Sequence, residues 1–234
     1  MSFTRSILSF AAAASFALGA APAMADTIPL TSANVGQSYT LNYNGFTGDG
    51  TIAGLTASTT FTLTGISGNQ YTFDYSLTNT TSDPVNSRVS SFGFNTNPDI
   101  TGASSTGAFS YTTLDSSYPN GIGAIDVCFK DAATGACSGG GSGGLTDGQT
   151  GTGTFTLSFS QPVSALTLSD FYVRYQSITG AGNVSSASGA GTQTSTGSSG
   201  GEVPEPGVVG LLGAAMIATA VLRRRRKPAE PALA

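Results

Sequence analysis

The chain contains no histidine and no tryptophan, and charged residues make up only 9% of its 234 residues. Without histidine, Ser-His-Asp and Cys-His catalysis and most zinc hydrolase sites are excluded. Glutamate is absent from the body of the chain before Glu202, so a glycosidase would need a pair of aspartates. These absences favour a non-enzymatic protein, to which we assign no catalytic residue, no metal and no other cofactor.

Basic residues are equally scarce between residues 26 and 203, where only Arg88, Lys130 and Arg174 occur. An acidic body of this kind cannot neutralise phosphate groups, which excludes nucleic acid as a partner. Five further basic residues are concentrated near the C-terminus, beside an apolar run. That position is typical of a membrane-topology signal.

The first 25 residues have the features of a cleaved secretory leader, with a signal helix. Arg5 is followed by the apolar stretch Ile7–Leu18, and Ala23 and Ala25 then fit a small-x-small cleavage pattern that leaves Asp26 as the first mature residue. A second such pattern two residues earlier gives a competing site. The alternative, an N-terminal membrane anchor, would need a longer apolar run. We therefore expect the Sec translocon and signal peptidase as partners.

Three features follow one another at the C-terminus. The first is a short rigid motif, Pro204, Glu205 and Pro206. The second is the uncharged stretch Val208–Leu222, a short transmembrane helix whose reach flanking arginines can extend. The third is a stop-transfer cluster, which consists of Arg223, Arg224, Arg225, Arg226 and Lys227. Because such a cluster stays in the cytoplasm, both ends of the chain place the body outside the inner membrane.

This order of motif, membrane helix and arginine cluster resembles the PEP-CTERM sorting domain, over residues 203–227. The resemblance implies a Gram-negative bacterium that makes exopolysaccharide, and processing by exosortase, a membrane cysteine protease. Pro204, Glu205 and Pro206 would be the recognition motif. Residues 228–234, expected as a cytoplasmic tail, extend past the point where such domains usually end. The alternative is a plain membrane anchor with an accidental Pro-Glu-Pro.

Between the body and this tail, residues 179–202 consist almost entirely of Gly, Ser, Ala and Thr. Such a composition predicts a disordered linker, because it offers too little apolar surface to order itself. Some two dozen residues would give a flexible reach of about 25–30 Å. We expect this segment to tether the folded body while the protease reaches its site.

Residues 26–178 are predicted to form one all-β extracellular domain. Apolar and polar residues alternate around Phe61, over Tyr71–Leu77 and over Phe155–Phe159, with a fainter pattern at Val89–Phe94, and turn residues separate these runs. Short strands with frequent turns favour two packed antiparallel sheets, of β-sandwich or jelly-roll type.

The last run changes parity between Leu166–Leu168 and Phe171–Tyr175. A bulge near Ser169-Asp170 would reconcile the two halves. Arg174 would then face outward with Asp170 and Tyr172 as a surface pair. The alternative is that both faces of this strand are covered.

Cys128 and Cys137 are the only cysteines. The oxidising envelope favours a disulfide between them. By closing the loop between the two cysteines, it would stabilise the fold by roughly 2.5–3 kcal/mol. The run Gly139–Gly144 lacks the lysine of a phosphate-binding loop, and we expect it to be mobile. The paired cysteines beside this run are also similar to a PEP-CTERM subgroup, the cistern family, which implies no activity.

The sequence thus indicates an exported surface or matrix protein, held in the membrane transiently, with exopolysaccharide as the expected partner. One alternative is a carbohydrate-binding module with exposed tyrosines, for which Tyr118, Tyr172 and Tyr175 are candidates. Another is an aspartate-based hydrolase with two carboxylates about 5–10 Å apart in a cleft. Eight aspartates of the body are available: Asp74, Asp83, Asp99, Asp115, Asp126, Asp131, Asp147 and Asp170. A weaker calcium hypothesis names Asn42, Asn44 and Asp49.

Overall fold

The computed structural model describes residues 26–134 and 136–197. The leader, the Pro204–Pro206 motif, the apolar stretch 208–222, the arginine cluster and the tail 228–234 lie outside these residues. Within the described ranges, no helix has both the length and the apolar character needed to cross a membrane.

The all-β prediction is confirmed. Apart from two 3₁₀ turns, Ser32–Asn34 and Gly107–Phe109, the regular elements of the described chain are strands. In chain order they are β1 (Thr27–Leu30), β2 (Ser38–Thr47), β3 (Gly50–Ser67), β4 (Gln70–Asn79), β5 (Asn86–Asn97), β6 (Gly102–Ser105), β7 (Tyr111–Tyr118), β8 (Gly123–Lys130), β9 (Leu145–Thr146), β10 (Thr150–Ser158), β11 (Leu166–Thr179) and β12 (Ser186–Gly197).

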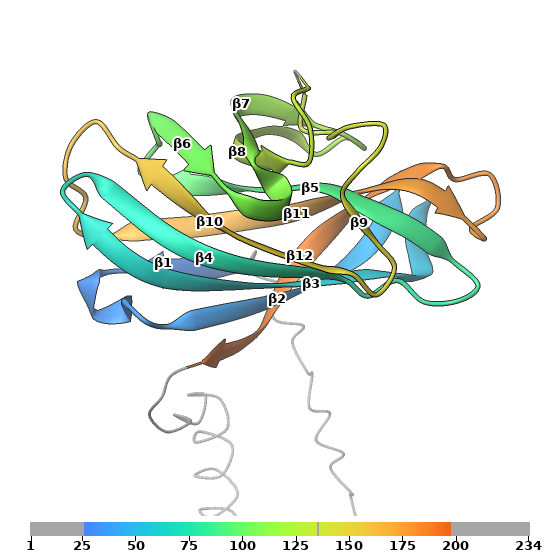
Figure 1. Cartoon of the computed structure of the whole chain (residues 1–234), viewed down its shortest axis with the longest axis horizontal. Helices are drawn as coiled ribbons and strands as arrows, with labels where there is room; N and C mark the ends of the chain where they lie inside the picture. Colours follow the sequence, from blue (N-terminus) through green and yellow to red (C-terminus); the bar gives the residue numbers. More distant parts are fainter. Residues whose placement is uncertain (1–25, 135, 198–234) are drawn as a thin grey trace, which may run out of the picture.

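The strands form one antiparallel sheet, whereas we expected two separate ones. Its order is β6-β10-β4-β3-β2-β12-β11-β5-β8-β7, with β1 on β11 and β9 on β5. The sheet folds over so that β2, β3 and β4 face β5 and the β7–β8 hairpin across the core (Figure 1). Thr112 of β7 donates to the Ala103 carbonyl of β6 at 3.3 Å, so the two ends of the sheet nearly meet. Register shifts in the β2–β3, β3–β4 and β11–β5 pairs supply the bends that a continuous sheet needs to curl.

Aromatic rings fill the space between the two layers. Phe61 of β3 lies 5.8 Å from Phe92 of β5 and 6.1 Å from Phe171 of β11, measured between ring centroids. Phe155 of β10 lies 4.7 Å from Phe129 of β8 in the same way. Each buried phenylalanine stabilises the fold by about 1.5–3 kcal/mol through burial alone. The alternating residues of the sequence therefore supply the inner faces, as predicted.

Strand β5 is buried on both faces, which explains why its alternation was faint. Its inward residues include Phe92 and Phe94, while Ser91 and Gly93 face a second, smaller cluster. That cluster is apolar and comprises Tyr118, Ile125, Cys128 and Cys137, with Ile122 and Tyr172 beside it. The β7–β8 hairpin thus covers the outer face of β5 and β11.

The predicted linker is wrong over residues 186–197, which form β12 at the centre of the sheet. This strand pairs with β11 on one side and with β2 on the other. Its small residues are needed there: a Cβ added at Gly189 would come within 2.8 Å of Tyr175 and 2.9 Å of Val173. The large rings on neighbouring strands fill the space that β12 leaves, and backbone hydrogen bonds to both neighbours order the strand.

The bulge predicted at Ser169-Asp170 is confirmed by a register shift between Ser169 and Tyr172 in the β11–β5 pair and by a φ of 52° at Asp170. The outward surface pair is wrong, however. Arg174 is buried, and its Nη2 donates to Ser186 Oγ at 2.7 Å. The alternative arrangement holds, in which both faces of β11 are covered.

Candidate functional site

The sorting motif and the stop-transfer arginines, Arg223 to Arg226, fall outside the described residues, as do Ala23 and Ala25. Their roles therefore stay predictions. The structure does place Asp26, both cysteines, the three basic residues of the body and all eight candidate aspartates.

Cys128 and Cys137 lie together in the second cluster. Both are free thiols in this structure and fully buried. The Cys128 thiol donates to the Cys137 carbonyl oxygen at 3.7 Å. Burial raises the pKa of Cys128, while a hydrogen bond from Cys128 lowers the pKa of Cys137. The two side chains are therefore neighbours, and their disulfide in the oxidising envelope stays a prediction.

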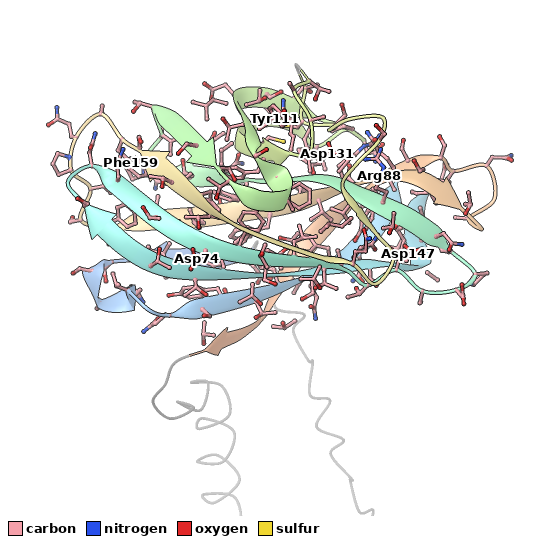
Figure 2. The ribbon with its side chains drawn as sticks, viewed as in Figure 1. Asp74, Arg88, Tyr111, Asp131, Asp147 and Phe159 are labelled. Atoms are coloured by element: carbon pink, nitrogen blue, oxygen red, sulfur yellow. The ribbon has the colours of Figure 1, made fainter. Side chains whose placement is uncertain are left out.

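The structure also contains a buried ion pair, which the sequence did not indicate. Arg88 of β5 and Asp131 are 2.9 Å apart, with side chains 8% and 2% exposed. Arg88 also donates to the carbonyl oxygens of Gly140 and Gly143, each at 2.7 Å, and to Gln176 Oε1 at 2.6 Å. Figure 2 shows Arg88 and Asp131 close together on the upper side of the molecule, near the segment that carries β9 in Figure 1.

Backbone groups of the glycine run 139–144 hydrogen-bond to this ion pair, while the mobility that we expected of the run stays a prediction. Gly140 N donates to the second Asp131 oxygen at 2.6 Å. Gly139 and Gly144 have φ angles of +73° and +72°, and a Cβ at either would collide with the backbone of β5. Gly139 and Gly144 must therefore be glycine, because the run passes too close to β5 for a side chain and has a left-handed backbone at both positions.

The eight candidate aspartates are distributed over different strands and turns. Asp74 is exposed on β4 and Asp147 lies well away from it at the other end of the sheet (Figure 2). One hollow of about 140 Å³ is lined by two aspartates, Asp26 and Asp170. It is smaller than the roughly 300–1,000 Å³ typical of ligand pockets, so a sugar chain does not fit in it.

The candidate sugar-binding tyrosines do not form an exposed platform. Tyr118 and Tyr175 are 2% and 0% exposed, and Tyr172 is half-buried. The calcium candidates are also separated: Asn42 lies in mid-strand on β2, about 17 Å along an extended strand from Thr47, which precedes the Asp49 turn. These residues are not gathered into one site.

Hydroxyl groups form a face on the outward side of β2, β3, β4 and β10. We call it the hydroxyl face, and it consists of Ser38, Thr40, Thr60, Thr62, Thr72, Ser76, Thr78, Thr150, Thr152, Thr154 and Thr156. Pairs of its hydroxyls meet across neighbouring strands. Examples are Ser38–Thr62 and Thr78–Thr150 at 2.8 Å and Thr40–Thr60 at 3.0 Å. Such cross-strand pairs each contribute roughly 0.2–1 kcal/mol to the sheet.

The hydroxyl face is almost uncharged. Among the residues of β2, β3, β4 and β10, the only ionisable group that carries charge at neutral pH is Asp74. The basic residues of the body are instead buried elsewhere: Arg88 with Asp131, Lys130 against Thr113 and the Thr134 carbonyl, and Arg174 against Ser186. Each paired hydroxyl retains lone pairs with which to accept further hydrogen bonds.

The sequence alternation contained the hydroxyl face, because threonine or serine occupies most outward positions between the inward apolar residues of these strands. Only the register showed that the strands align these hydroxyls side by side. No family model, no curated protein and no solved structure matched the chain when it was compared with each.

Proposed function

We propose that this chain is an exported, non-enzymatic surface protein, held in the inner membrane by its C-terminal segment until exosortase cleaves it near Pro204–Pro206. The observation that carries the proposal is the order of three elements in the sequence: Pro-Glu-Pro, an apolar stretch and an arginine cluster. The two-layered β domain is the part delivered to the cell surface or the extracellular matrix.

The positions of the two ends of the domain support this topology. The Asp26 carboxylate accepts a hydrogen bond from Gln193 N at 2.5 Å, so the start of the domain lies against the last strand. Only residues 198–203 separate β12 from Pro204, and six residues span at most about 20 Å. The domain would therefore be held close to the membrane during cleavage, closer than a two-dozen-residue linker would hold it.

The sorting proposal is tested by intact mass spectrometry of the protein from cells with and without exosortase. A chain from Asp26 to near Pro204 is expected in the first strain, and a chain that retains Arg226 in the second. The same spectra report whether Cys128 and Cys137 have lost two hydrogens to a disulfide. Identical C-termini in both strains would reduce the tail to a plain membrane anchor.

For the role of the domain, we propose that the hydroxyl face contacts a neutral polysaccharide of the surrounding matrix. Its hydroxyls both donate and accept, as sugar hydroxyls do, and it carries a single charge, that of Asp74. Because the basic residues of the body are buried, the domain offers no positively charged surface that would bind an acidic polymer. Exposed large apolar residues of the described chain, Val35 and Tyr111, form no patch of the kind that binds proteins.

Retention on a neutral polysaccharide resin tests this role. The variant T60E/S76E places two like charges opposite each other in the β3–β4 register, at the centre of the hydroxyl face. We expect it to elute with the void volume, whereas the control S117E, at an exposed position on β7, should be retained like the wild type. Equal retention of both variants would remove the hydroxyl face from the proposal.

A further inference from the structure

Asp26 lies opposite another carboxylate at the edge of the sheet. Strand β1 pairs with β11 from Thr27, which faces Ser169. Continuing this antiparallel register by one residue brings Asp26 opposite Asp170, and both residues line the same hollow with Phe171, Tyr172, Ala190 and Gly191. Like charges directly opposite each other on paired strands destabilise a sheet.

The described residues supply no cation to this hollow. Asp170 accepts from Asn95 Nδ2 at 3.1 Å and from Ser169 Oγ at 3.3 Å, and Asp26 accepts from the backbone of Gln193. All of these donors are neutral. Among the described residues, the only ion pair is Arg88–Asp131, so none of the three basic side chains of the domain pairs with either carboxylate.

We propose that the missing cation is the α-ammonium group of Asp26 itself, which forms when the leader is removed and which then pairs with Asp170. Hydrolysis of the Ala25–Asp26 bond consumes one water, leaves a carboxylate on Ala25 and gives Asp26 an amine that takes up a proton. Removal of the leader thereby creates the positive charge that balances the carboxylates beside β1. This inference rests on the export and leader cleavage of the proposed function.

The pairing has a defined pH dependence. The groups that face the α-ammonium are the carboxylates of Asp26 and Asp170 and the phenol of Tyr172, while Ala190 and Gly191 of β12 are uncharged. Two anions favour the charged form, so the α-amino pKa should lie above its ordinary value of about 7.7–8.0. The stabilisation is present below the pKa of the unfolded chain and is lost as the pH rises through the folded value.

The test is the pH dependence of α-amine labelling on the mature protein purified after export, read by peptide mapping. The labelling midpoint should lie above 8, and in D170N it should fall toward the ordinary value of about 7.7–8.0. The exposed turn variant D49N is the matched control and should keep the wild-type midpoint. A variant with one alanine inserted between Ala25 and Asp26 should behave like D170N, because its ammonium is displaced from the hollow.

The peptide map also separates the two proposals. A chain that starts at Asp26 with the same midpoint in D170N and wild type would overturn the ion pair and leave export intact. A start at another position near the predicted site would overturn the ion pair in the same way. A chain that still begins at Met1 would overturn both.

Discussion

At the scale of single residues, the least expected feature is the buried Arg88–Asp131 pair. Charges of this kind are tolerated inside a protein only when their hydrogen bonds are satisfied. Here the glycine run 139–144 supplies those bonds with its backbone, and Gln176 supplies one more. The glycines and the ion pair are therefore one structural unit.

Replacing Asp131 with alanine should destabilise the domain by about 3–5 kcal/mol, because it leaves the Arg88 guanidinium buried without its counter-charge. Urea unfolding of the two proteins measures the difference. The exposed turn residue Asp49 offers the control, and D49A should stay within about 0.5 kcal/mol of the wild type. A small effect of D131A would mean that hydrogen bonds to the glycine carbonyls alone are sufficient to stabilise the buried Arg88 guanidinium.

At the scale of elements, β12 determines how the chain must fold. It is the last strand of the described chain, yet it lies between β2 and β11, two strands far apart in the sequence. The sheet is therefore incomplete until residues 186–197 have paired with both neighbouring strands. A strand in this position contributes backbone hydrogen bonds on both sides, which compensates for its lack of apolar side chains.

Substitutions at two glycines of β12 test whether residues 186–197 form a packed strand or a flexible tether. G189A should destabilise the domain by about 1–3 kcal/mol, because the added methyl group meets Tyr175 and Val173 at less than 3 Å. G197A should be close to neutral, since its nearest neighbours lie 3.7 Å away. Thermal unfolding compares the two. Equal melting temperatures would contradict the central position of β12.

The strands differ in how well the sequence predicted them. Alternation around Tyr71–Leu77 and Phe155–Phe159 predicted strands correctly, because each has one wet face. The parity change at Ser169-Asp170 likewise predicted the bulge. Composition failed for residues 186–197, since small residues that make room for large rings look the same as those of a flexible linker. The ion pair was missed because Arg88 and Asp131 are distant in sequence and their shared neighbours are backbone atoms.

At the scale of the whole molecule, the burial of tyrosine makes the stability depend on pH in the alkaline range. Tyr43, Tyr118 and Tyr175 are buried, and burial raises the pKa of each phenol well above the ordinary value of 10. In the unfolded chain these phenols ionise near pH 10, while in the folded chain they keep their protons. The unfolded state therefore binds fewer protons above pH 10, and the free energy of unfolding falls as the pH rises.

We expect this fall to begin near pH 10. These three phenols together contribute about 4 kcal/mol per pH unit, since each contributes about 1.4. Tyr39, Tyr71, Tyr75 and Tyr172, whose pKa values burial also raises, steepen the fall further. It continues until the pH reaches the folded pKa values. Urea unfolding between pH 8 and pH 11 measures the slope. In Y118F the slope should decrease by about 1.4 kcal/mol per pH unit, whereas Y111F, at a position 45% exposed, should leave it unchanged. A stability that stays constant from pH 9 to pH 11 would mean that water reaches these phenols in the folded protein.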